Sequence, residues 1–113
     1  MELSVVIPAF NEFAVIANTV NHVHEFLTKK DIKGEIIVVN DGSTDETVKI
    51  LAYLQGSIPH FRALTLPVNT GKGAACRAGF IASRGEWCIF MDADESTKIE
   101  TWNVFKPFTE KFD

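Results

Sequence analysis

The sequence lacks several features that would assign it directly to a class of protein. It has only two cysteines, Cys76 and Cys88, and they form no Cys-x-x-Cys pair, so neither a disulfide framework nor a cysteine-rich zinc site is predicted. We expect both to be reduced thiols packed in the core. No apolar run reaches the roughly 18 residues of a membrane span, and no signal-peptide pattern is present. These absences predict a soluble, cytoplasmic protein, and a position at the cytoplasmic face of a membrane stays open for a longer form.

An excess of positive charge is also missing. Eleven Lys and Arg stand against fifteen Asp and Glu, for a net charge of −4, so the composition favours neither nucleic-acid binding nor attraction to anionic membrane surfaces. The three histidines, His22, His24 and His60, are not spaced as metal ligands with cysteine or carboxylate partners. No Ser/His/Asp or Cys/His arrangement indicates nucleophilic catalysis.

What the sequence does contain is an alternation of strand and helix patterns within a length suited to one domain. Apolar, β-branched runs predict strands at residues 3–7, 35–39, 61–66 and 87–91. Helical patterns predict helices at residues 12–30, 44 to about 55, and 73–84, with Ser43 and Glu46 as a capping box and Gly85 as a C-terminal cap.

This alternation predicts an α/β fold. We expect a Rossmann-like three-layer sandwich with a mainly parallel sheet of spatial order 3-2-1-4. Residues 97–113 are predicted to be a helical tail of the same domain, although Pro107 would interrupt it. Its aromatic residues, Trp102, Phe105 and Phe108, are spaced like one helix face, which either packs on the domain or allows self-association.

A polar cluster follows each predicted strand. The clusters lie at residues 11–12, 40–43, 69–73 and 92–96. Because the carboxyl ends of parallel strands meet at one edge of a sheet, where ligands bind in open α/β folds, these clusters are predicted to form one active-site rim.

The sharpest signal on this rim is the pair Asp92 and Asp94. In an extended chain, side chains two residues apart point to the same side. Two carboxylates so placed repel each other unless a cation lies between them, and oxygen ligands with open positions suit Mg²⁺ or Mn²⁺ bound to substrate phosphates. The alternative is a solvated acidic turn.

The other rim residues have both a functional and a structural interpretation. Asp41 could accept hydrogen bonds from a nucleobase N–H or from sugar hydroxyls, or it could stabilise its own turn. Residues 71–73 (Gly-Lys-Gly) are similar to a phosphate cradle at the start of a helix. Lys72 and Arg77 could serve that site or be ordinary surface residues, and helix capping accounts for Asp45.

Taken together, these motifs resemble the GT-A glycosyltransferases of family 2. The family's successive motifs correspond to Pro-Ala-Phe-Asn-Glu at residues 8–12, Asn-Asp-Gly-Ser-Thr-Asp at 40–45, Asn-Thr-Gly-Lys-Gly at 69–73, Arg-Ala-Gly at 77–79 and Asp-Ala-Asp at 92–94. Order and spacing agree over residues 3–96. The Gly-Lys-Gly variant is most similar to polyprenyl-phosphate (dolichyl-phosphate) sugar synthases.

The resemblance implies that residues 1–96 are the nucleotide-sugar-binding part of a GT-A domain. It implies inverting, metal-assisted transfer from a UDP- or GDP-sugar to an acceptor such as polyprenyl phosphate, with Mn²⁺ or Mg²⁺ on Asp92 and Asp94. The residues implied in nucleotide-sugar binding are Pro8, Ala9, Asn11, Glu12, Asp41, Gly71, Lys72, Arg77, Asp92, Ala93 and Asp94.

Family members continue for roughly as many residues again, with the acceptor site and the usual catalytic carboxylate. The resemblance therefore implies no catalytic residue in this chain, and we expect the isolated chain not to turn over. A stand-alone nucleotide-binding module is the main alternative. A receiver domain and a nucleotidyltransferase are disfavoured, because the carboxylates follow the second and fourth strands and Pro8 stands where a nucleotidyltransferase would have a glycine-rich, basic loop.

Overall fold

The computed structural model describes residues 2–94. The strands are β1 (Leu3–Ala9), β2 (Gly34–Asp41), β3 (Phe61–Leu66) and β4 (Trp87–Phe90), and the helices are α1 (Ile16–Lys29), α2 (Thr47–Ser57) and α3 (Lys72–Ala82). Within residues 2–94, no helix is long and apolar enough to cross a membrane. The predicted C-terminal tail and its aromatic face lie outside the described residues.

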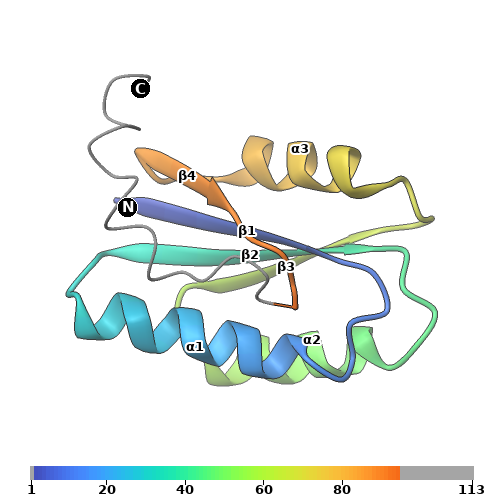
Figure 1. Cartoon of the computed structure of the whole chain (residues 1–113), viewed down its shortest axis with the longest axis horizontal. Coiled ribbons are helices and arrows are strands. Elements are labelled where there is room, and N and C mark those ends of the chain that lie inside the picture. The colour runs from blue at the N-terminus through green and yellow to red at the C-terminus, as the bar shows by residue number, and fades with distance from the viewer. Residues whose placement is uncertain (1, 95–113) are drawn as a thin grey trace.

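The four strands form one parallel sheet in the order β3-β2-β1-β4, which confirms the predicted order and fold class. Helix α3 covers one face of the sheet, and α1 and α2 cover the other (Figure 1). The carboxyl ends of all four strands therefore point to the same edge, on the right in Figure 1.

The central strands are continuous apolar runs because both of their faces are buried. On β1, Leu3, Val5 and Ile7 pack into the core beneath α1 and α2, whereas Val6 packs beneath α3. The α3 side has a thinner core, since Gly79 lies directly over Val6 and a Cβ on Gly79 would come within 2.3 Å of the Val6 Cγ1 atom. Helix α3 thus packs closely on the sheet through its buried residues Ala75 and Gly79.

Helix α1 begins later than the sequence pattern predicts. The expected start was residue 12, but the helix begins at Ile16. Asn11 has a φ of 53°, and the carbonyl of Glu12 accepts the N–H groups of Val15 and Ile16. Residues 11–15 therefore form a turn that leads into the helix, although the apolar periodicity of α1 extends back to Val15.

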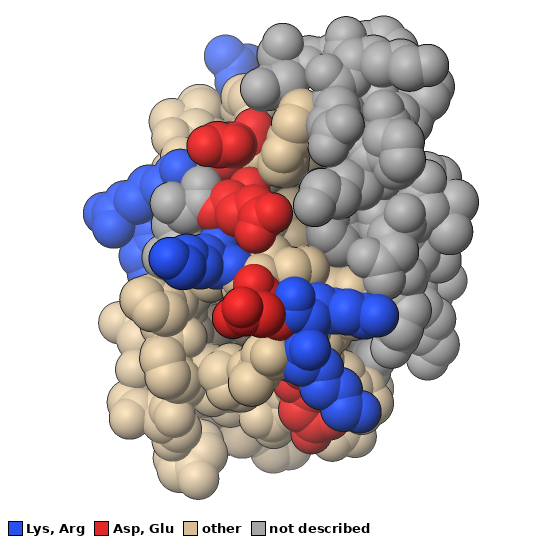
Figure 2. Space-filling model, turned by 90° about the vertical axis from the view of Figure 1, so that its left-hand side faces the viewer, with Lys and Arg blue, Asp and Glu red and all other residues tan. Residues whose placement is uncertain are grey.

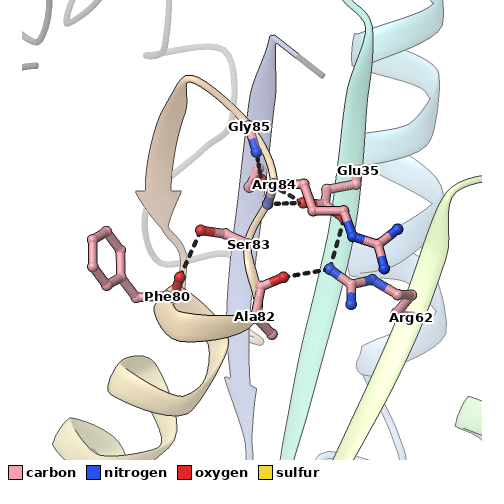
Figure 3. A network of polar contacts seen from close by, with 8 residues as sticks. Glu35, Arg62, Phe80, Ala82, Ser83, Arg84 and Gly85 are labelled. Atoms are coloured by element: carbon pink, nitrogen blue, oxygen red, sulfur yellow. Dashed lines mark hydrogen bonds and ion pairs between the residues drawn. The ribbon is translucent and has the colours of Figure 1, made fainter.

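A buried polar cluster closes the opposite, amino-terminal end of the sheet (Figure 3). The carboxylate of Glu35, which is 3% exposed, accepts hydrogen bonds from the Ser4 hydroxyl (2.6 Å), the Arg84 N–H (2.6 Å) and the Arg62 guanidinium (2.9 Å). These contacts join β1, β2 and β3 to the segment that follows α3. Burial favours a higher pKa for Glu35, but the three donors outweigh it and hold the pKa below its ordinary value of 4.5.

This cluster also explains how α3 ends. The predicted glycine cap is wrong, because α3 ends at Ala82 and the N–H of Gly85 donates to the Ser4 hydroxyl at 2.8 Å. The Ala82 carbonyl accepts instead from the Arg62 guanidinium at 2.6 Å. A side chain from β3 therefore satisfies an end-of-helix carbonyl that a left-handed glycine usually serves.

Charges of both signs share this end of the molecule. Figure 2 shows the left-hand side of Figure 1, where Lys and Arg side chains interleave with Asp and Glu side chains. The described part of this face therefore has no broad area of one sign.

Replacing Glu35 with Gln should lower the free energy of unfolding at pH 7 by about 1.5–3 kcal/mol, because hydrogen bonds to a buried charged acceptor are lost. Since the folded-state pKa lies below 4.5, the carboxylate stabilises the fold above that pH, and this contribution disappears as pH falls through the folded-state pKa. Urea unfolding at pH 7 and near pH 3 should therefore show that the difference in free energy of unfolding between wild type and variant is smaller at the lower pH. Glu25→Gln, at an exposed position on α1, is the matched control.

Candidate functional site

A cavity of about 510 Å³ lies at the carboxyl edge of the sheet. Its lining residues come from the ends of β1, β2 and β4 and from the start of α3. They are Pro8, Ala9, Phe10, Glu12, Asp41, Asn69, Gly71, Lys72, Asp92, Ala93 and Asp94. All residues implied in nucleotide-sugar binding are in this set except Asn11 and Arg77. Phe10 was not predicted to line the site, and Asn69 was predicted only as part of the rim cluster 69–73. The predicted rim is thus brought together into one concave site.

Hydrogen bonds from α1 and to β1 hold the turn that carries the paired aspartates. Ala93 is buried, and its carbonyl accepts a hydrogen bond from the hydroxyl of Thr19, a fully buried residue of α1. The N–H of Met91 continues the sheet ladder to the Val6 carbonyl at 3.0 Å. With the residue between them held inward, Asp92 and Asp94 line the cavity. The role of Thr19 could not be predicted, since its partner lies 74 residues away in the chain.

Negative charge accumulates on this side of the cavity. Burial raises the pKa of Glu12, and the carboxylates of Asp94, Asp45 and Asp92 raise it further. Lys72 forms an ion pair with Asp92, and this hydrogen bond and charge raise the pKa of Lys72. A site with this charge pattern favours a cation bound together with an anionic ligand.

Asp41 fastens the loop before α3. Its Oδ1 atom accepts the N–H and hydroxyl of Thr70 at 2.8 and 2.7 Å, and its Oδ2 atom accepts the Gly71 N–H at 2.8 Å and the Asn69 side-chain amide at 3.2 Å. Burial favours a higher pKa for Asp41, but the Thr70 and Gly71 donors outweigh it and lower the pKa. Asp41 therefore stabilises a neighbouring loop, whereas the structural alternative in the sequence analysis was its own turn.

Asn11 makes a similar connection between the β1 and β2 loops. Its side-chain oxygen accepts the N–H groups of Thr44 (2.8 Å) and Asp45 (3.3 Å), and its own N–H donates to the Ser43 hydroxyl at 3.0 Å. Asn tolerates the positive φ at this position better than most residues. Asn11 thus shapes the rim from outside the cavity, while Arg77 is exposed on α3 and does not line the cavity.

These contacts also change the predicted start of α2. The capping box is wrong, because Glu46 makes no side-chain capping hydrogen bond and the Ser43 hydroxyl accepts from Asn11. Asp45 serves the helix start instead, with its Oδ1 atom accepting the Thr47 N–H at 2.9 Å. The capping role expected for Asp45 is therefore present without the box.

The acidic residues fit a divalent metal that is shared with a ligand. Across residues 2–94, no three His, Cys, Asp or Glu side chains are grouped so that they could hold a metal by themselves. Mg²⁺ and similar ions in phosphate-handling sites commonly use one or two carboxylates together with substrate phosphates and water. Asp92 and Asp94 supply such a pair beside the helix start of α3, which is a favourable position for phosphate.

A second cavity, of about 540 Å³, lies at the other end of the sheet between the end of α1 and the loop before β3. Leu27, Ile32, Ile36 and Pro59 make its lining mainly apolar, and among the described residues of its lining Asp31 is the one carboxylate. It has no counterpart to the paired aspartates, so we place the functional site at the carboxyl edge.

A parallel α/β sheet with an acidic rim at its carboxyl edge is typical of a GT-A glycosyltransferase. A sequence model described as glycosyl transferase family 2 matches residues 4–110. The chain belongs to this family.

Relatives and solved structures agree with that assignment. The chain is 36% identical to the dolichyl-phosphate beta-glucosyltransferase of Dictyostelium discoideum, with 98% of this chain and 36% of that protein covered. It is 40% identical to the corresponding Homo sapiens protein, with 86% and 32% covered. The chain thus spans about a third of the length of these curated relatives.

Two solved structures with bound nucleotide sugars share the fold. S. aureus TarS 1-349 in complex with UDP-GlcNAc matches with a TM-score of 0.77 and 25% identity, over 98% of this chain and 32% of that chain. The mannosyltransferase PcManGT from Pyrobaculum calidifontis, in complex with GDP-Man and Mn2+, matches with a TM-score of 0.74 and 25% identity, over 82% and 27%. The GT-A fold class is therefore confirmed.

Replacing Asp41 with Asn should lower the free energy of unfolding by about 1.5–3 kcal/mol, because the variant loses a buried charged acceptor. The Asn side chain would also place an amide N–H donor against the N–H groups of Thr70 and Gly71, which cannot accept it. Thr70→Val removes only the hydroxyl donor and should cost about 0.5–1.5 kcal/mol. Urea unfolding followed by circular dichroism measures both, and an Asp41→Asn protein as stable as wild type would contradict the loop-fastening role.

Proposed function

We propose that the full-length protein transfers a sugar from a nucleotide-diphospho-sugar to a polyprenyl phosphate, with inversion at the anomeric carbon. The observation that carries this proposal is that Asp92, Asp94 and Lys72 line the same cavity, beside the start of α3. Relatives named dolichyl-phosphate beta-glucosyltransferases support glucose as the sugar and a dolichyl-type lipid as the acceptor. The bound ligands of the structural neighbours support a UDP- or GDP-linked donor.

In this proposal each part of the rim has a separate task. Asp92 and Asp94 would hold a divalent ion, Mn²⁺ or Mg²⁺, which when bound stabilises the negative charge of the leaving diphosphate. Lys72 and the first N–H groups of α3 would bind phosphate oxygens. Pro8, Ala9 and Phe10 form the wall at the end of β1, where we place the nucleoside.

Asp41 and Asn11 would act on the donor chiefly through the loops that they hold. Fixing these loops before the ligand arrives reduces the ordering cost of binding. We also propose that Glu12, whose pKa is raised by burial and by neighbouring carboxylates, faces the metal side of the site. A direct contact of Arg77 with the donor remains a prediction, since Arg77 is exposed on α3.

The acceptor side is proposed for the whole protein. We propose that the 113-residue chain binds the donor without turnover, and that the lipid acceptor places the full-length protein at the cytoplasmic face of a membrane. If this chain formed lipid-linked sugar from labelled UDP- or GDP-sugar and polyprenyl phosphate, the proposal that it binds the donor without turnover would be contradicted. The stand-alone nucleotide-binding module remains the second candidate, because the chain spans only about a third of its relatives.

Nucleoside diphosphate binding should depend on Mn²⁺ or Mg²⁺ through the paired aspartates. Asp92→Asn or Asp94→Asn should weaken the metal-dependent affinity for UDP or GDP by about ten- to a hundredfold, or ~1.4–2.8 kcal/mol, because each removes a charged oxygen ligand. Isothermal titration calorimetry with and without metal measures the effect. Asp31→Asn, in the second cavity, should bind like wild type, and equal affinity with and without metal in the wild type would count against the site.

A further inference from the structure

Lys72 joins the two halves of the proposed site. Among the described residues that line the cavity it is the one cationic side chain. Its ammonium forms an ion pair with Asp92, and the two side chains are 66% and 35% exposed. A group suited to a phosphate therefore pairs directly with a group suited to a metal in the ligand-free protein.

The position of Lys72 follows from the loop that Asp41 holds. Gly71 has a φ of 98°, a conformation that favours glycine, and its N–H donates to the Asp41 carboxylate at 2.8 Å. Helix α3 begins at the next residue, Lys72. The buried hydrogen bond to Asp41 therefore positions the backbone next to Lys72. The side chain of Lys72 is mostly exposed.

This pairing affects how a metal can bind. A divalent cation that arrives alone competes with the Lys72 ammonium for Asp92 and leaves the ammonium without that partner. A cation that arrives with a diphosphate brings phosphate oxygens, to which the ammonium can move. Charge stays compensated only when the metal and the diphosphate bind together.

We propose that Lys72 is a counter-ion that occupies Asp92 in the free protein and transfers to the diphosphate when metal and nucleotide bind together. This inference rests on the proposed donor site. It adds that the metal binds well only together with the nucleotide. By thermodynamic linkage, the same lysine raises the dependence of nucleotide binding on metal. Lys72 is thus a positioning residue for the metal as well as a ligand of the phosphate.

The test compares wild type with Lys72→Gln in two separate titrations. In the first, Mn²⁺ alone is added and free ion is measured by electron paramagnetic resonance. Lys72→Gln should bind Mn²⁺ about two- to fivefold more tightly, the size expected for loss of a competing surface ion pair. In the second, UDP or GDP is added at saturating Mn²⁺, and the variant should bind about ten- to a hundredfold more weakly, because a charge-assisted phosphate contact is lost.

Lys30→Gln is the matched control, since it removes the same charge at the end of α1 and should leave both affinities unchanged. Lys72→Gln binding Mn²⁺ no more tightly than wild type would overturn the counter-ion role, even if nucleotide binding depends on metal. Tighter Mn²⁺ with unchanged nucleotide affinity would overturn the transfer to the diphosphate. A wild type that binds no nucleotide would remove the proposed function, but the metal-only comparison would still decide the role of Lys72.

Discussion

The shape of the candidate site depends on the buried carboxylate of Asp41 at the end of β2. Strand β2 is flanked by β1 and β3, so the Asp41 backbone is fixed by the sheet. Its carboxylate accepts hydrogen bonds from residues 69–71 and transmits that position to the start of α3. The adjoining Gly42 has a φ of 69°, and a Cβ there would lie 2.5 Å from the backbone of Val68 and Asn69. The loops after β2 and β3 therefore contact each other closely, and the position of the first turn of α3 is set without a ligand.

The carboxylates at the two ends of the sheet differ in how many of them are enclosed by donors. At the amino-terminal end, Glu35 is enclosed by donors from the protein itself, including the Arg62 guanidinium, which is the arrangement expected of a structural group. At the carboxyl end, Glu12, Asp41, Asp92 and Asp94 line one cavity with Lys72. Burial and then the neighbouring carboxylates raise the pKa of Glu12, and the excess of negative charge favours a cation there. Asp41 stabilises the carboxyl end as Glu35 stabilises the amino-terminal end, and the other three carboxylates of the cavity are the ones proposed to bind.

The sequence predicted the elements and the rim because both depend on local patterns. Continuous β-branched runs identify strands buried on both faces, and a parallel sheet brings their carboxyl ends together whatever the side-chain details. The missed features are pairings between distant residues. Thr19 holds the carbonyl of Ala93, Ser43 accepts from Asn11 where a capping box was expected, and Glu35 pairs with Arg62. No local spacing encodes such contacts, so only the packed structure shows that Asn11 shapes the cavity from outside.

In the proposed function, a metal ion and a nucleoside diphosphate occupy the carboxyl-edge cavity together. The most direct measurement is an NMR titration of the ¹⁵N-labelled chain with a small amount of Mn²⁺ in the presence of UDP or GDP, because the bound ion broadens nearby amide signals. Broadening should be strongest for Glu12, Gly71 and Ala93 and weakest for Lys33 and His60, which line the second cavity. Broadening centred on the second cavity, or of equal strength at both ends of the sheet, would contradict the account.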